Sequence, residues 1–440
     1  MKPVSRKPLD WEARSQARRM QLDFYPVTEY ARAFCAHLGP LLSGANPRKT
    51  RRRGEKAEGR FNAACGAFFA DLLKAQQRST GRWSWHEQSP NTFTGEKVSY
   101  RHFKQIMTAA SDLGLIEIHR GFYDREVFGE KSSSGRGRAT RIRPLGKFLK
   151  LAVGLGISPE NIDQNFHEHP PTRVLVLKAP STRAGHIKSQ GRPMRFAASS
   201  VSARLEKEVR EINAFWTTIE LSGAIHRGFR RVFNEGKKEG YDWDRGGRLY
   251  SIGEDNYQLL KKQQRAAIRI NGEPVIELDI RASHLTILHG IFGVPMVPSK
   301  DPYEVNGVPR GVVKAWVTMA LGKGDVPKRW SPAHIEDMRE LGIELSRDYP
   351  LKKITPVILG ALPVLRKWER QKLSSLELMY YESQAIIRTV LTLIRKHQIA
   401  SLPVHDSLIV QRRHATSCKQ LIVEHYEQIC GMTPAVHEGE

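Results

Sequence analysis

The stretch that decides the fold of the second half of the chain is VIELDIRASHLTILHGIFG, residues 275–293. Its first residues are apolar β-formers and predict a strand, and a helical spacing of apolar residues begins at Ser283. Asp279 therefore lies at the end of a strand, where the chain turns toward a helix. An aspartate in such a place is, taken alone, most often a solvated turn residue.

Two further segments favour a functional role for Asp279. In ASLPVHDSLIVQ (400–411), two apolar runs flank His405-Asp406, which predicts a β-hairpin with this pair at its tip. In the segment 310–318, Arg310 and Lys314 are four residues apart and share one face of a predicted helix. Carboxylates on separate strands can hold two Mg²⁺ ions about 3.5–4 Å apart, and a cationic helix face can hold a triphosphate. The three segments together favour phosphoryl transfer.

These segments belong to an ordered set that resembles family A polymerases, the DNA polymerase I-like class, whose palm is related to that of single-subunit phage RNA polymerases. The resemblance covers residues 225–430. The motifs that carry it are Gly247-Arg248-Leu249, Asn256-Tyr257-Gln258, LDIRASHL with Asp279, Asp301-Pro302-Tyr303, Arg310 with Lys314, and Val404-His405-Asp406-Ser407. Any one of these motifs is weak, but their order along the chain makes the set specific.

The resemblance implies a role for each matching residue. Asp279 and Asp406 would be catalytic and would bind two Mg²⁺ ions, for which Mn²⁺ can substitute, with help from the Ile280 carbonyl. The implied nucleotide-binding residues are Arg310, Lys314, His284, Tyr303 and Thr318. The implied primer and template contacts are Arg248, Gln258 and His405.

The sequence departs from the family pattern at several positions near the implied site, among them Leu321-Gly322, where the family has Tyr-Gly. His284 stands where the family has a glutamate that helps to exclude ribonucleotides, and Thr318 stands where the family has an aromatic residue. Ser407 replaces a carboxylate after the second catalytic aspartate. The preferred sugar of the nucleotide is therefore left open, whereas metal binding by two aspartates is less affected.

Two candidate site residues stay open on the sequence. Glu382 lies in LELMYYESQAIIRTVL (376–391), a helix with an apolar face, and can either face the site or be a surface charge. Tyr250 can reach the nucleotide or belong to the core.

The chain before residue 199 divides into three segments. Residues 1–58 are polar and basic, with a cluster of cations at 48–53, and read as a solvated N-terminal segment with nucleic-acid contact as the second interpretation. Residues 59–154 resemble a winged-helix DNA-binding domain in pattern, with 99–113 as recognition helix and 123–138 as wing; the alternative is a structural helix and hairpin. Residues 155–198 are rich in Pro, Ser, Arg and Gly and predict a linker.

Composition agrees with a nucleic-acid partner. The 440 residues include 70 Lys and Arg against 46 Asp and Glu, a formal net charge of +24. Such a surplus favours a polyanion, because phosphate neutralisation releases counterions. We find no apolar run long enough to span a membrane and no secretion signal. The four cysteines match neither a zinc pattern nor a disulfide framework, which fits a reduced cytoplasm.

The sequence thus predicts an α+β protein: a helical, winged-helix-like N-terminal region, then a polymerase domain over 199–440 with a compact palm sheet, helical fingers and a short thumb helix. We expect a cytoplasmic, nucleoid-associated monomer that binds primer-template DNA and nucleoside triphosphates. The expected activity is primer extension as a DNA-dependent DNA polymerase, without a proofreading exonuclease. The alternatives are RNA synthesis, as polymerase or primase, and a DNA-binding replication initiator with an inactive palm. A phage, plasmid or other mobile element is the biological context suggested by analogy.

Overall fold

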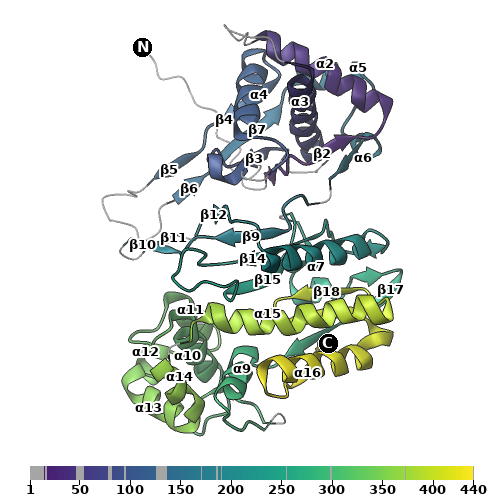
Figure 1. Ribbon diagram of the computed structural model, residues 1–440. Coiled ribbons are helices and arrows are strands. Elements are labelled where there is room, and N and C mark those ends of the chain that lie inside the picture. Colours follow the sequence, from purple (N-terminus) through teal and green to yellow (C-terminus); the bar gives the residue numbers. More distant parts are fainter. Residues whose placement is uncertain are drawn as a thin grey trace, which may run out of the picture. The chain divides into compact units, whose positions relative to one another are not determined.

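The computed structural model describes residues 14, 17–45, 54–77, 82–93, 96–124, 136–169, 171–184, 187–189, 191–253, 255–297, 300–371 and 373–439. The chain divides into two compact units (Figure 1). Unit 1 comprises residues 1–173 and 181–194, and unit 2 comprises residues 174–180 and 195–440. Both units mix helices with small sheets, which is compatible with the expected α+β class.

Unit 1 is built from helices packed with short strands. Its main sheet has the strand order β1 (Arg18–Arg19), β3 (Ser84–His86), β7 (Thr140–Pro144), β4 (Ile116–His119). Its other strands are β2 (Phe24–Pro26), β5 (Phe122–Asp124), β6 (Arg136–Arg138), β8 (Phe166–Glu168), β10 (Thr182–Ala184), β11 (Ile187–Ser189) and β12 (Pro193–Met194). Its helices include α2 (Glu29–Ala45), α3 (Glu55–Gln76), α4 (Tyr100–Asp112), α5 (Gly146–Gly154) and α6 (Ile162–Asn165). An aromatic core joins them, in which Phe69 stacks on Phe148 with ring centroids 4.4 Å apart.

The recognition helix expected over 99–113 is present in unit 1 as α4. Ser99 caps α4, because its hydroxyl accepts a hydrogen bond from the His102 backbone N–H at 3.2 Å. Strands β4 and β7 follow as an antiparallel pair, and α5 comes next. Most of the expected wing, residues 125–135, and the basic cluster 48–53 lie outside the described residues. The winged-helix assignment therefore stays a prediction.

Two segments differ from the sequence-based expectation. Within the expected solvated segment 1–58, α2 is a helix that buries Phe34, Leu38 and Leu42. Pro40 lies inside this helix and interrupts the sequence pattern, which obscures the helical spacing of these apolar residues. Within the expected linker 155–198, β9 (Leu175–Lys178) is a buried strand that pairs with a strand of unit 2. Prolines and short polar runs on both sides of these four residues obscure the strand pattern.

Unit 2 contains two sheets. In the first, β9 pairs with β14 (Phe229–Phe233), which pairs with β15 (Gly246–Ser251). The second sheet has the order β13 (Leu221–Ser222), β16 (Arg269–Ile270), β17 (Glu273–Ile280), β19 (Ser407–Gln411), β18 (Ser401–Val404), and β20 (Val436–Gly439) also pairs with β17. Strand β17 is thus central in the second sheet, and its residues Val275, Ile276, Leu278 and Ile280 are buried.

Helices of unit 2 pack against both sheets and against one another (Figure 1). They are α7 (Ser200–Trp216), α8 (Lys262–Arg265), α9 (Ser283–Ile291), α10 (Arg310–Lys323), α11 (Pro332–Arg339), α12 (Leu345–Asp348), α13 (Leu351–Ala361), α14 (Pro363–Gln371), α15 (Ser375–Thr392) and α16 (Ala415–Cys430). Helix α15 packs against α9, α16 and β15, and therefore connects the two sheets. Among the described residues, no helix is long and apolar enough to cross a membrane.

The close packing of α9 on α16 gives a stability prediction. A Cβ atom at Gly290 would lie 1.8 Å from the Cys430 backbone carbonyl oxygen, so any side chain must push the two helices apart. We expect Gly290→Ala to lower the free energy of unfolding by about 2 kcal/mol, despite the higher helix propensity of alanine. Urea unfolding measures this change. Gly360→Ala in α13 is the control, because its nearest neighbour is a flexible arginine end at 3.9 Å, and an equal loss in both variants would contradict the packing argument.

Candidate active site

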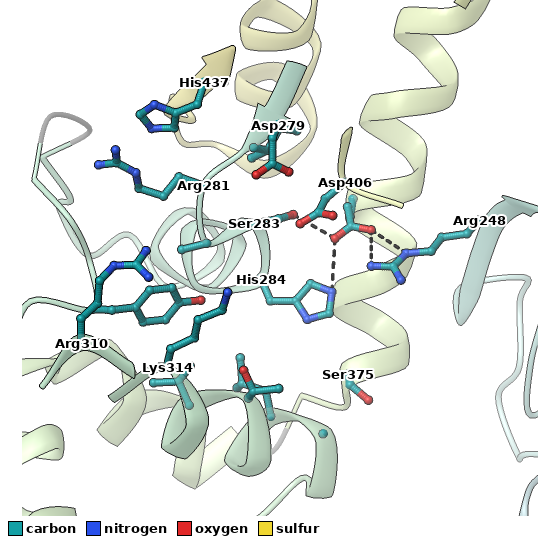
Figure 2. Close-up of a pocket in the computed structure, with 18 residues that line it drawn as sticks. Arg248, Asp279, Arg281, Ser283, His284, Arg310, Lys314, Ser375, Asp406 and His437 are labelled. Atoms are coloured by element: carbon teal, nitrogen blue, oxygen red, sulfur yellow. Dashed lines mark hydrogen bonds and ion pairs between the residues drawn. The ribbon is translucent and has the colours of Figure 1, made fainter. Parts of the chain in front are cut away.

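The β-hairpin β18–β19 places the two predicted catalytic aspartates side by side. Asp279, near the end of β17, pairs with Ser407, the first residue of β19. Asp406 precedes Ser407 in the two-residue turn of the hairpin, where His405 has a left-handed backbone with φ of 57°. The Ile280 backbone N–H donates a hydrogen bond to the Asp406 carbonyl oxygen at 3.3 Å. Figure 2 shows both carboxylates at the same pocket.

This pocket has a volume of about 480 Å³ and is lined by residues from β15, β17, α9, α10, α15 and the hairpin turn. It brings together ten of the residues predicted from the sequence. They are Arg248, Asp279, Ile280, His284, Tyr303, Arg310, Lys314, Thr318, Glu382 and Asp406. Residues more than 150 positions apart along the chain thus converge on one cavity.

The negative charge of each carboxylate in the pocket makes ionisation of its neighbours less favourable. Burial raises the pKa of Asp406 to about 7, and the neighbouring carboxylates of Glu382 and Asp279 add to this rise. Burial and the charge of Glu277 raise the pKa of Asp279. Carboxylates whose negative charges are held together in this way gain most from a bound cation.

Glu382 lines the pocket and is buried, so it is not a surface charge. Its carboxylate is 1% exposed, and its Oε1 accepts hydrogen bonds from Arg248 Nε at 2.6 Å and from the second guanidinium nitrogen at 2.5 Å. Its Oε2 accepts from Ser283 Oγ at 3.0 Å and lies 3.4 Å from His284 Nε2. Figure 2 shows these contacts as dashed lines. Burial acts to raise the pKa of Glu382, but His284 and Arg248 outweigh burial and lower it.

The exposed face of α10 borders the pocket on another side. Arg310, Lys314 and Thr318 are four residues apart and exposed, whereas Val313 and Trp316 on the opposite face are buried in the core. Arg310 forms an ion pair with Asp301, and its guanidinium carbon lies 5.5 Å from the centroid of the Tyr303 ring. The helix ends at Gly324, whose backbone is left-handed with φ of 74°.

Three predicted site residues do not line the pocket. Gln258 donates to the carbonyl oxygens of Leu249 at 3.1 Å and Pro403 at 2.8 Å, and thus ties β15 to β18. His405 and Tyr250 contact each other edge to face with ring centroids 6.3 Å apart. Burial and the charge of Arg248 lower the pKa of His405. In this arrangement Gln258 supports the hairpin from within the fold, and Tyr250 and His405 form an aromatic pair beside the turn.

Other lining residues were not assigned a role from the sequence. Arg281 and Ser283 follow Asp279 by two and four residues, and this closeness in the sequence is a signal that they lie near the same site. Ser375 at the start of α15 and His437 on β20 also line the pocket. His437 lies opposite Asp279 in the β17–β20 pair. Nothing in the sequence near His437 indicates this pairing, because it joins residues at opposite ends of unit 2.

The donor set fits Mg²⁺ held jointly by protein and substrate. In the described parts of the chain, no group of three or more His, Cys, Asp or Glu side chains is arranged to hold a metal ion. Mg²⁺ is usually bound by one or two carboxylates together with substrate phosphates and water, rather than by an all-protein cage. Asp279 and Asp406 at the edge of a cation-lined pocket offer such a pair of carboxylates.

Comparison with known proteins adds little to this geometry. No known protein family and no curated protein matches the chain. Among solved structures, the chain is similar to the POL domain of Pol1 from M. smegmatis, in complex with DNA primer-template and dNTP. That similarity has a TM-score of 0.24 and 15% sequence identity, and it covers 44% of this chain and 45% of that chain. A similarity of this size carries no argument about function, which must be argued from the pocket itself.

Proposed function

We propose that the chain is a template-directed nucleotidyltransferase that extends the 3′-hydroxyl of a DNA primer with deoxynucleotides. The observation that carries the proposal is the convergence of Asp279 and Asp406 on a pocket that α10 flanks with Arg310 and Lys314. Nucleotidyl transfer needs carboxylates on one side of the reacting phosphate and cations around the departing pyrophosphate.

In this proposal Asp279 and Asp406 hold the divalent cations, with the Ile280 carbonyl close by. Bound Mg²⁺ would supply activation of the attacking hydroxyl and stabilisation of the leaving oxygen. Lys314 and Arg310 would hold the phosphates of the incoming nucleotide, which keeps the nucleotide in line with the primer end. Tyr303 and Thr318 border the same cavity and would limit where the nucleotide can lie.

Glu382 would act by holding its neighbours. Its two oxygens fix Arg248 on one side and His284 on the other, so that both side chains stay at the pocket wall. Arg248 would then be in place to contact the primer end, as the resemblance to family A polymerases implies. The proposal thus gives Glu382 a positioning role rather than a part in the chemistry.

DNA as the partner rests on the charge of the chain. A formal net charge of +24 favours binding to a phosphate backbone. Unit 1, with α4 as the candidate recognition helix, would hold or select the DNA, in the cytoplasm and on the nucleoid. Binding of this kind weakens steeply as the salt concentration rises, which provides a simple check of the electrostatic contribution.

RNA synthesis is the second candidate function, and one observation favours it. His284, where family A has its gate glutamate, faces the pocket and lies 3.4 Å from Glu382. In this second candidate function, His284 in place of the glutamate would let the site accept ribonucleotides. An inactive palm in a DNA-binding initiator is the alternative from another class, and the presence of Asp279, Asp406 and Lys314 in one pocket argues against it.

Primer extension tests the proposal. The purified chain is incubated with Mg²⁺ and primed DNA, with either deoxynucleotides or ribonucleotides, and products are resolved on a denaturing gel. We expect Mg²⁺-dependent extension that is lost on chelation with EDTA, and faster with deoxynucleotides. Faster extension with ribonucleotides would select RNA synthesis. No extension with either nucleotide, together with salt-sensitive DNA binding, would contradict the proposal and leave a binding protein.

A further inference from the structure

The cations around the pocket differ in whether the protein already neutralises them. Arg248 is bound to Glu382, and Arg310 forms an ion pair with Asp301. In the part of the chain that the structure describes, neither Arg281 nor Lys314 has a side-chain hydrogen bond or ion pair, although both line the cavity. The charges of Arg281 and Lys314 act on Asp301 and Asp279, respectively, without a direct ion pair, so both side chains keep donors that a ligand can use.

Arg281 is held in place by its backbone. It follows Asp279 by two residues in the turn between β17 and α9, and its N–H donates a hydrogen bond to the Ala435 carbonyl oxygen at 2.9 Å. Arg281 is partly buried and lines the cavity. Lys314 reaches the same cavity from α10, a different element (Figure 2). The backbone bond at residue 281 leaves the arginine side chain available for a ligand.

We propose that Arg281 and Lys314 together form the main anion-binding site of the pocket, and that Arg281 binds the polyphosphate of the incoming nucleotide. The nature of this anion rests on the proposed function, whereas the presence of an anion site rests on the two unpaired cations. A guanidinium can donate two parallel hydrogen bonds to one phosphate, and an ammonium group adds a compact point charge. Arg310 is secondary in this assignment, because Asp301 competes with a ligand for its guanidinium.

The proposed anion site also lies next to the carboxylates that we propose to bind the metal ions. Asp279 is on β17, two residues before Arg281, so an anion held by Arg281 lies next to the carboxylates proposed to hold the metal. His437 of β20, which pairs with Asp279 in the sheet, lines the same wall and can add a hydrogen bond. The carboxylates would hold the metal ions and the neighbouring cations would hold the phosphates, so this arrangement suits a metal-bound polyphosphate.

Binding of inorganic tripolyphosphate tests the site without requiring catalysis. Isothermal titration calorimetry at fixed ionic strength compares the full chain with Arg281→Gln, Lys314→Gln and Arg329→Gln. Arg329 is exposed and lies outside the lining of the pocket, so the last variant removes the same charge elsewhere in unit 2. We expect Kd to rise about tenfold or more for each pocket variant and to change less than about twofold for the control. Arg281→Lys keeps the charge without the paired donors, and we expect an intermediate Kd.

The outcomes separate this inference from the proposed function. Equal tripolyphosphate affinity in wild type and Arg281→Gln, with both proteins folded by circular dichroism, would overturn the role of Arg281. Primer extension with an unchanged nucleotide KM in Arg281→Gln would also overturn it and leave the polymerase intact. Suppose that tripolyphosphate binding depends on Arg281 but the wild-type chain extends no primer. This result would support the anion site and contradict the proposed polymerase function. If Arg281→Gln misfolds, Arg281→Lys supplies the same comparison.

Discussion

Replacing either of the two aspartates that we propose to be catalytic should abolish primer extension while leaving the fold intact. For Asp279→Asn and Asp406→Asn we expect kcat to fall at least about 10³-fold, because removing a metal-binding carboxylate costs several kcal/mol of transition-state stabilisation. Single-turnover extension on primed DNA measures the loss. The side chains are nearly equal in size, so the variants change charge and not packing.

Stability supplies the control for these aspartate variants. Burial and neighbouring carboxylates raise the pKa of Asp406 to about 7, which means that the folded protein holds its ionised form at a cost. Asp406→Asn removes that cost, so the free energy of unfolding at pH 8 without metal should stay equal or rise. An inactive variant that is also strongly destabilised would show only misfolding, and a stable variant with full activity would contradict the assignment of Asp406.

Replacing Glu382 should have the largest effect on stability among the pocket residues. In Glu382→Gln the guanidinium of Arg248 stays largely buried, with a side chain 15% exposed, but loses its counter-charge. Removing one partner of a buried pair typically costs about 3–5 kcal/mol, and we expect a loss of about 3 kcal/mol in the free energy of unfolding at pH 7.5, measured by urea denaturation. Glu340→Gln, at an exposed position in unit 2, is the matched control and should change stability little.

The contribution of Glu382 to the free energy of unfolding should fall as the pH falls. The folded protein lowers the pKa of Glu382, so this group stabilises the fold above its unfolded pKa and the contribution is lost as the pH falls through the folded pKa. The difference in the free energy of unfolding between wild type and Glu382→Gln should therefore be largest at pH 7.5 and become smaller in acid. A difference that stays constant from neutral to strongly acidic pH would show that the carboxylate charge does not stabilise Arg248.

Some of this site follows from the sequence and some does not. The strand-to-helix stretch around Asp279 and the hairpin around Asp406 carry local patterns, since apolar runs fix the strands and the polar residues fall at the ends. The face of α10 is equally local, because residues four apart share a side of any helix. These patterns predict the elements and the residues that each element presents.

Contacts between distant elements are the part that could not be predicted. A single glutamate on an apolar helix gives no sign of its partner, and Glu382 meets Arg248 only because α15 packs against β15. The same holds for His437 on β20, opposite Asp279, and for Asp301 beside Arg310. Strand β9 has no clear signal in the sequence, because three apolar residues followed by Lys178 are too short a run to show a periodicity.

The measurement that tests the central claim most directly is single-nucleotide incorporation on four primed DNA templates that differ only at the templating base. Each of the four nucleotides is offered alone with Mg²⁺, and the added nucleotide and the released pyrophosphate are both quantified. We predict addition of the complementary nucleotide only, one pyrophosphate for each addition, and no product with Asp279→Asn. Addition that ignores the templating base, or the same product from Asp279→Asn, would contradict a template-directed polymerase site in this pocket.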